Sequence, residues 1–255
     1  MAPRAIDTHA HLFLREFVGD LAAVTHRAKG ICEAVLLPNL DSRTLPEVKV
    51  LMQEEPQFYY GMIGLHPSYV KADFQQELRF IEAELDKHRW IGIGEVGIDL
   101  FHDSSTYDWQ AEALNIQAQW AQRLKLPLSI HFRKALMETL SLLHPYEVRG
   151  VFHCFTGSYE EGKRIIDAGF HLGIGGVLTY KNAAPLREAI QKLPLEFIVL
   201  ETDSPYLAPV PMRGKRNESS FISYIARALA ELKGLPVEAV IETTTATARR
   251  LFDLA

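Results

Sequence analysis

The sequence predicts a (β/α)₈ barrel, formed by a single domain over residues 1–255. Short apolar, β-branched runs alternate with longer amphipathic stretches along the whole chain. Eight such runs begin at intervals of 20 to 37 residues, and each interval has room for a strand, a helix and two loops. The runs are mostly continuous in hydrophobicity rather than alternating, as expected for parallel strands that are buried on both faces.

The eight predicted strands are 4–7, 32–37, 59–64, 90–94, 127–130, 150–152, 170–174 and 197–200. Between them, residues 74–89, 109–125 and 219–233 repeat apolar side chains at helical spacing. A last helix begins at Pro236, since proline is tolerated in a first helical turn. A doubly wound open sheet is the alternative fold. It more often has a Gly-rich phosphate-binding turn after the first strand, where this chain has two histidines.

Composition and charge exclude several classes of protein. With 47% hydrophobic and 23% charged residues, the chain has an ordinary globular composition. A net charge of −5 provides no global basic field that would attract nucleic acid or an anionic membrane. Two cysteines form no disulfide framework, and no apolar run resembles a signal core or a membrane span. We expect a cytoplasmic protein without a membrane partner, and we favour a monomer.

Polar residues gather where the predicted strands end. Because active sites of such barrels form at the C-terminal ends of the strands, these residues are expected to meet at one end of the barrel. They are the histidines His9, His11, His66, His131 and His153 and the carboxylates Glu95 and Asp203. Taken singly, each could be a hydrogen-bonded core residue. Burying four histidines and two carboxylates together is costly without a cation, so we predict metal ligands in His9, His11, Glu95, His131, His153 and Asp203.

Two further residues are candidates beside this site. His66 precedes a proline, so it could form a structural turn, support a ligand from behind or contact the substrate. Arg133 follows His131 by two residues and shares its side of the strand, which suits a guanidinium that binds phosphate or carboxylate. The alternative for Arg133 is a salt bridge to Glu95 or Glu201.

Seven motifs follow one another along nearly the whole chain. They are DTHAHL (7–12), GLHP (64–67), GEVGID (94–99), HFR (131–133), HCFTG (153–157), ETDSPYL (201–207) and RGKRNE (213–218). In this order they resemble the TatD-type metal-dependent deoxyribonucleases of the amidohydrolase superfamily. The resemblance implies two divalent metal ions, one bound by His9, His11 and Asp203 and the other by His131 and His153, with Glu95 bridging them. These residue types do not choose among Zn²⁺, Mg²⁺ and Mn²⁺.

The resemblance also implies a function, the metal-dependent hydrolysis of DNA, and the net charge of −5 favours a 3′–5′ exonuclease that trims a chain end over a protein that coats long DNA. Asp203 is the expected general base toward a metal-activated water, and Arg133 and the metals offset charge on the phosphate. Lys215, Arg216 and Asn217 are expected to contact the DNA backbone, unless they form a solvated basic loop. Two alternatives stay open. One is a hydrolase of small phosphoesters, amides or lactones at the same metals, and the other is a metal-binding scaffold without catalytic activity.

Overall fold

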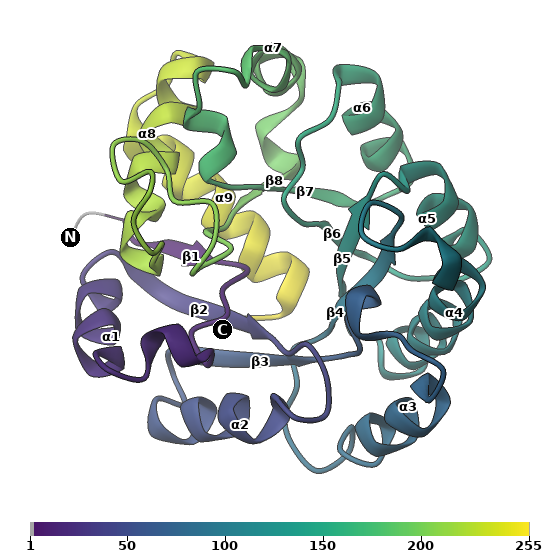
Figure 1. The fold of residues 1–255 in the computed structure, drawn as a ribbon. Coiled ribbons are helices and arrows are strands. Elements are labelled where there is room, and N and C mark those ends of the chain that lie inside the picture. The colour runs from purple at the N-terminus through teal and green to yellow at the C-terminus, as the bar shows by residue number, and fades with distance from the viewer. Residues whose placement is uncertain (1–2, 255) are drawn as a thin grey trace.

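In the computed structural model, which describes residues 3–254, eight parallel strands follow one another in sequence order around a barrel (Figure 1). This arrangement confirms the predicted (β/α)₈ fold. The strands are β1 (Ala5–Asp7), β2 (Cys32–Pro38), β3 (Tyr59–Ile63), β4 (Gly92–Asp99), β5 (Leu128–Arg133), β6 (Gly150–Phe152), β7 (His171–Ile174) and β8 (Ile198–Leu200).

Helices surround the barrel and connect its strands (Figure 1). The α-helices are α1 (Leu21–Lys29), α2 (Leu45–Glu54), α3 (Phe74–Glu82), α4 (Tyr107–Leu124), α5 (Leu136–Leu143), α6 (Tyr159–Asp167), α7 (Ala184–Lys192), α8 (Ile222–Lys233) and α9 (Val237–Phe252). Short 3₁₀ turns lie at η1 (Arg15–Phe17), η2 (Pro67–Tyr69), η3 (Ser104–Thr106), η4 (Gly176–Thr179), η5 (Leu195–Phe197) and η6 (Ser219–Phe221).

Two strands extend several residues beyond their predicted ends, and both carry site residues. β4 continues to Asp99 and β5 to Arg133, where the two residues pair with each other. Hydrophobicity alone placed the ends at residues 94 and 130. The ladder of hydrogen bonds to the neighbouring strand, and not the apolar content of the segment, decides where each strand ends. Glu95 therefore lies within β4, and His131 lies within β5.

The core has two parts, and α9 closes one end of the barrel. A large cluster fills the space between the sheet and the helices, while a smaller one lies inside the ring of strands. In the smaller cluster, Leu36, Met62 and Val199 from the strands pack with Leu251 and Phe252 of α9. Figure 1 shows α9 crossing behind the ring. The C-terminal ends of the eight strands meet at the opposite end of the barrel from α9, where active sites of this fold form.

The barrel is joined between β8 and β1 by loop backbone rather than by a full strand ladder. Thr8 donates its N–H to the Leu200 carbonyl at 3.0 Å, and the Asp203 N–H donates to the His9 carbonyl at 2.8 Å. Buried Asp7 completes this seam by accepting hydrogen bonds from the backbone N–H and the hydroxyl of Thr202 at 2.8 and 2.7 Å. The seam thus fixes His9 relative to Asp203.

Replacing Asp7 with alanine is expected to lower the free energy of unfolding by about 2 to 4 kcal/mol, because two buried donors of Thr202 lose their acceptor. Urea unfolding of Asp7→Ala beside the wild type measures the difference. Asp7→Asn retains one acceptor oxygen, so its free energy of unfolding should lie between those of Asp7→Ala and the wild type. Equal midpoints for all three proteins would contradict the role assigned to this carboxylate.

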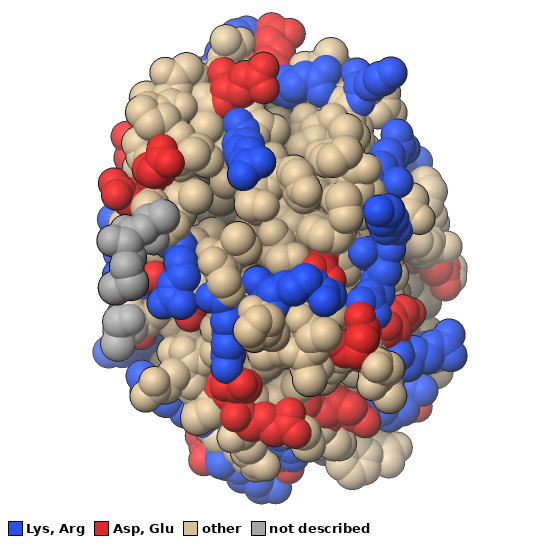
Figure 2. All heavy atoms as spheres, turned by 90° about the vertical axis from the view of Figure 1, so that its left-hand side faces the viewer, with Lys and Arg blue, Asp and Glu red and all other residues tan. Residues whose placement is uncertain are grey.

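Charge on the outer surface is mixed. Figure 2 shows, on the face carrying α1 and α8, Lys and Arg side chains across the middle and along one edge, with Asp and Glu side chains beside them. This pattern agrees with the small net charge of −5. Among the helices of residues 3–254, none combines the length and apolar character needed to cross a membrane.

Candidate metal centre

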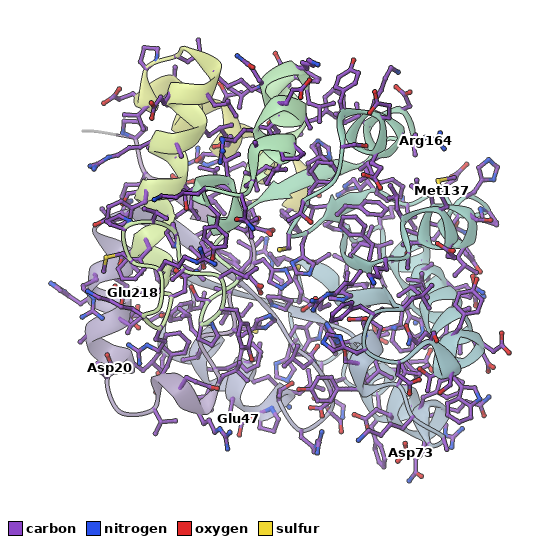
Figure 3. The ribbon with its side chains drawn as sticks, turned by 45° about the horizontal axis from the view of Figure 1, so that its top comes forward. Asp20, Glu47, Asp73, Met137, Arg164 and Glu218 are labelled. Atoms are coloured by element: carbon purple, nitrogen blue, oxygen red, sulfur yellow. The ribbon has the colours of Figure 1, made fainter. Side chains whose placement is uncertain are left out.

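A cavity of about 940 Å³ opens at the C-terminal ends of β5 and β6. His131, His153 and Asp203 lie at its inner end, and the walls come from the loops that lead into α5 and α6. Met137 and Arg164 form part of its rim on the α5–α6 side, where Figure 3 shows them next to each other. The volume suits a small molecule or a few nucleotides.

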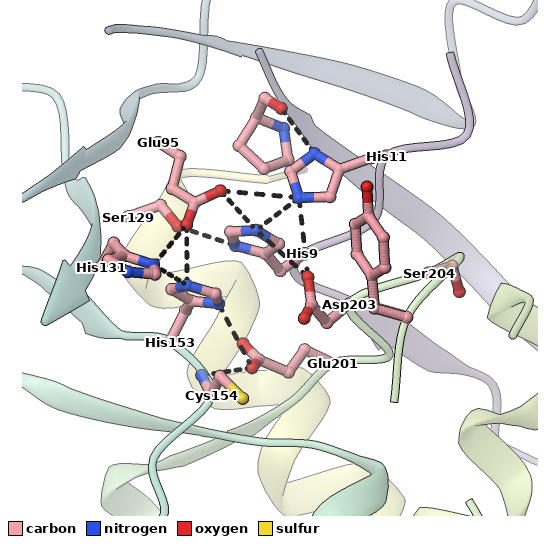
Figure 4. A network of polar contacts seen from close by, with 12 residues as sticks. His9, His11, Glu95, Ser129, His131, His153, Cys154, Glu201, Asp203 and Ser204 are labelled. Atoms are coloured by element: carbon pink, nitrogen blue, oxygen red, sulfur yellow. Dashed lines mark hydrogen bonds and ion pairs between the residues drawn. The ribbon is translucent and has the colours of Figure 1, made fainter. Parts of the chain in front are cut away.

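Glu95 lies at the centre of the polar network, and each of its oxygens faces a different group of histidines (Figure 4). Oε2 is 3.2 Å from Nε2 of His9 and 3.5 Å from Nε2 of His11. The same two nitrogens lie 3.2 Å apart, and Oδ1 of Asp203 is 3.6 Å from His11 Nε2 and 4.0 Å from His9 Nε2. We call His9, His11 and Asp203, together with Glu95 Oε2, the first cluster.

The other carboxylate oxygen of Glu95 faces a second cluster, made of His131 and His153. Oε1 of Glu95 is 3.1 Å from Nδ1 of His131 and 2.8 Å from Nε2 of His153, and these two nitrogens are 3.3 Å apart. Atoms bound to one ion at about 2.1 Å lie about 3.0 to 3.4 Å apart at octahedral to tetrahedral angles. The pairs of histidine nitrogens, 3.2 Å apart in the first cluster and 3.3 Å apart in the second, fit that requirement. Oδ1 of Asp203, at 3.6 and 4.0 Å from His11 and His9, lies somewhat farther from its neighbours.

Hydrogen bonding on the far side of the rings shows which nitrogens are free to bind a metal. Nδ1 of His11 lies 3.2 Å from the Pro38 carbonyl, and Nε2 of His131 lies 2.9 Å from Oδ2 of Asp99. Both oxygens can only accept, so these nitrogens carry the hydrogen. In the neutral rings, the opposite nitrogens then direct lone pairs toward the carboxylate of Glu95. Lone pairs facing a carboxylate repel it unless a second proton or a metal ion lies between them. Burial alone would lower the pKa of His131, but its hydrogen bonds to Asp99 and Glu95 raise it, so a metal ion bound there would take the place of that second proton. The donor set therefore fits metal ions.

Both carboxylates at the centre are anionic near neutral pH. Burial alone would raise the pKa of Glu95, but the imidazoles of His66, His153 and His9 outweigh it and hold that pKa well below 4.5. Burial also opposes ionisation of Asp203, whose pKa is nevertheless lowered by its contact with His11 and by neighbouring imidazoles. The centre therefore offers two negative charges to a cation.

Comparison with known proteins agrees with this chemistry. The family model described as "TatD related DNase" matches residues 6–253. The chain belongs to this family. Among its relatives is the "Uncharacterized metal-dependent hydrolase YabD" of Bacillus subtilis, 37% identical over 251 residues that cover 96% of this chain and 98% of that protein. The chain is thus a metal-dependent hydrolase of the TatD family, as its motifs predict.

Two further TatD-family relatives bear on fold and activity. The crystal structure of the TatD homologue YJJV from Escherichia coli superposes with a TM-score of 0.93 at 28% identity, and each chain is covered completely. A protein of Erwinia billingiae named "3'-5' ssDNA/RNA exonuclease TatD" is 31% identical over 258 residues, covering 97% of this chain and 98% of its own length.

His66 and Arg133, the two further candidates, have different surroundings in the structure. Nδ1 of His66 accepts a hydrogen bond from the Ser68 N–H, so Nε2 carries the hydrogen and donates it to Glu95 at 3.1 Å. His66 therefore supports the carboxylate of Glu95, and contact with substrate stays a prediction for it. Arg133 lines the cavity and lies 3.9 Å from the ring of Phe101. Within residues 3–254, it forms neither of the two salt bridges considered as alternatives.

The loop after β8 does not bring its predicted phosphate contacts into the cavity. Arg216 forms a double hydrogen bond with Asp20, at 2.7 Å for each pair of atoms. Asn217 is fully buried and donates to the carbonyls of Thr202 and Tyr206, both at 2.7 Å. These two side chains hold the loop in place, which corrects the prediction for them. Exposed Lys215 stays a candidate.

Sequence reasoning missed the groups behind the histidines. Asp99, Glu201 and Ser129 contact His131, His153 and His9 respectively. Asp99 and Glu201 belong to motifs that were recognised, but neither received a role. Extending the predicted strand 90–94 to residue 99 would have placed Asp99 at the barrel mouth. The position of Ser129, inside an apolar strand, carries no such signal.

Proposed function

We propose that the protein is an exonuclease that removes nucleotides from the 3′ end of single-stranded DNA, using two divalent metal ions. The observation that supports it is the pair of histidine clusters joined by Glu95 at the inner end of an open cavity, in a chain of the TatD family. The name of the Erwinia billingiae relative provides the direction and the strand type.

His9, His11 and Asp203 would hold one ion, His131 and His153 the other, and Glu95 both. Divalent ions in such a site supply an acidified water and offset negative charge on a phosphodiester. Asp203 lines the cavity and has a lowered pKa, so its carboxylate is ready to accept a proton from the attacking water. Cys154 is no competing nucleophile, because burial raises the pKa of its thiol well above 9.

Arg133 is the residue best placed to bind the scissile phosphate. Its guanidinium lies over the Phe101 ring, which limits its motion and leaves its N–H donors free for phosphate oxygens. Phe101 and Tyr206 are each about half exposed, at 49% and 50%. Aromatic side chains at this end of the barrel could stack on unpaired bases. Such contacts favour a single strand over a duplex.

The cavity wall is not strongly basic. Arg133, Lys134 and Arg164 are balanced by three glutamates, Glu138, Glu160 and Glu161. Attraction for a phosphate chain must therefore come mainly from the metals. This charge balance favours an enzyme that engages a chain end over one that coats long DNA.

A 5′-labelled single-stranded oligonucleotide, analysed on a denaturing gel, tests this function. Metal-stripped protein is compared with protein loaded with Mg²⁺, Mn²⁺ or Zn²⁺. We expect a metal-dependent ladder that shortens from the 3′ end. An otherwise identical oligonucleotide with phosphorothioate linkages at its 3′ end is the matched substrate, and its cleavage should be strongly reduced.

Other outcomes distinguish the alternatives. Equal cleavage of both oligonucleotides would exclude trimming from the 3′ end. If metal binds but neither oligonucleotide is cleaved, DNA is not the substrate. A screen of small phosphoesters, amides and lactones on the same metals then decides between a small-molecule hydrolase and an inactive scaffold.

Replacing Arg133 with alanine is expected to lower kcat/KM for the oligonucleotide by about 10- to 100-fold, since a charge-assisted hydrogen bond contributes about 1.5 to 3 kcal/mol. Steady-state kinetics at constant ionic strength measure the loss. Lys215→Ala is the comparison, because Lys215 does not line the cavity. A larger loss in Lys215→Ala than in Arg133→Ala would place the phosphate on the loop after β8 instead.

A further inference from the structure

The imidazoles of the two clusters differ in what lies behind them. In the first cluster the partners are neutral: Ser129 Oγ lies 3.1 Å from Nδ1 of His9, and the Pro38 carbonyl lies 3.2 Å from Nδ1 of His11. In the second cluster both partners are carboxylates, Asp99 and Glu201, supplied by β4 and by the residue that follows β8.

Asp99 is fixed firmly behind His131. Its side chain is 1% exposed, and Oδ2 accepts the Nε2–H of His131 at 2.9 Å. Oδ1 accepts the backbone N–H groups of Phe101 and His102 at 2.9 and 3.0 Å, and the His102 ring binds Oδ2 at 2.8 Å. A carboxylate held by this many donors fixes the orientation of the His131 ring.

Glu201 occupies the equivalent place behind His153 (Figure 4). It is fully buried, with Oε1 3.7 Å from Nδ1 of His153 and bonded to the Cys154 N–H. Within residues 3–254, neither His153 Nδ1 nor Glu201 Oε2 has a hydrogen-bond partner. Space for the carboxylate exists because residue 173 is glycine, where a Cβ atom would lie 2.2 Å from Oε2.

The charges of the two clusters explain why only the second cluster has carboxylates behind its histidines. Asp203 supplies a carboxylate directly to the first cluster, whereas the second has only its share of Glu95. A carboxylate behind an imidazole strengthens the opposite nitrogen as a ligand and fixes the ring. Asp99 and Glu201 thus place behind the second cluster the negative charge that its own ligands lack.

We propose that Asp99 and Glu201 are positioning residues for the metal ion of the second cluster alone. Neutralising either one should weaken that ion and leave the ion of the first cluster in place. The inference relies on the proposed two-metal function. It concerns metal binding, however, and is tested without nucleic acid, so failure to cleave DNA would leave it untouched.

The test is a competition titration of metal-stripped protein with Zn²⁺ against a chromophoric chelator, which resolves two dissociation constants. In Asp99→Asn and in Glu201→Gln, we expect one of the two constants to rise about 10- to 100-fold, with the other unchanged. Asp103→Asn is the matched control, because it neutralises an exposed carboxylate of the same loop. Co²⁺-loaded protein provides a second readout, the loss of one of two visible absorption contributions.

Double variants assign the weakened site. In a His11→Ala background, which leaves the second cluster intact, Asp99→Asn should weaken the remaining ion by the same factor. In a His131→Ala background, Asp99→Asn should have no further effect. Non-additivity of this kind identifies residues that act on one site.

Three results of the titrations would overturn the proposal. These are equal weakening of both ions, no weakening of either, and a loss that persists unchanged in the His131→Ala background. Thermal unfolding of the metal-free variants separates positioning from stability. If both metal-free variants unfold where the wild type is folded, the carboxylates stabilise the fold rather than the ion, and the proposal fails. If only one of the two metal-free variants is unfolded, the titration of the other, folded variant decides whether the proposal holds.

Discussion

Replacing Asp203 with asparagine is expected to lower kcat for phosphodiester hydrolysis by about 10²- to 10⁴-fold, the usual contribution of a general base. An amide has nearly the same shape as the carboxylate but cannot accept the proton of the attacking water. The backbone of residue 203 has a φ of +56°, in the left-handed region that asparagine tolerates well. The substitution should therefore leave the fold intact, whereas alanine would add strain.

The matched control for this variant is Asp253→Asn. Asp253 has a φ of +52°, so both substitutions are made in the same backbone conformation. Its side chain lies at the end of α9 and is 88% exposed. Within residues 3–254, its one salt bridge is to Arg149. Asp253→Asn should retain wild-type activity. Full activity in Asp203→Asn would exclude Asp203 as the base, and matching losses in both variants would indicate a general effect on folding.

Removing the metals is expected to lower the free energy of unfolding by about 2.7 kcal/mol per site. This figure compares metal-free protein with protein in a solution whose free metal concentration is about 100 times the dissociation constant. The ions bind the folded barrel, because their ligands come from strands far apart in the sequence. Glu95→Gln should abolish most of this difference, since one oxygen of the Glu95 carboxylate faces each cluster. Thermal or urea unfolding with Zn²⁺ and with a chelator measures the metal-dependent stability of each protein.

Glu84→Gln is the control for this second experiment. Glu84 lies outside the barrel, paired with Lys49 at 2.9 Å and Lys87 at 2.8 Å. This variant should lose a little stability in both conditions and keep the metal-dependent increment. An undiminished increment in Glu95→Gln would show that Glu95 does not bridge two ions. No increment in the wild type would remove the basis for a metal centre.

The sequence by itself determined the fold class and the residue types of the site. Both depend on local patterns: continuous apolar runs at regular intervals predict parallel strands, and a residue just after such a run lies at the barrel mouth whatever its neighbours are. His9, His11, His131 and His153 could therefore be placed without coordinates. The alternation of side chains along a strand also put Arg133 on the same side as His131, where the cavity is.

Only the tertiary structure decided how these residues are used. Which nitrogen of His11 or His131 faces the centre depends on Pro38 and Asp99, and those contacts connect segments that periodicity does not relate. The ends of β4 depend on pairing with β5, so Asp99 lay beyond the predicted strand. The sequence suggests that Arg216 and Asn217 contact phosphate. In the structure, Arg216 is hydrogen-bonded to Asp20 instead, and Asn217 to the Thr202 carbonyl. Hydrogen bonds between distant segments set protonation, orientation and availability, and a one-dimensional pattern does not contain them.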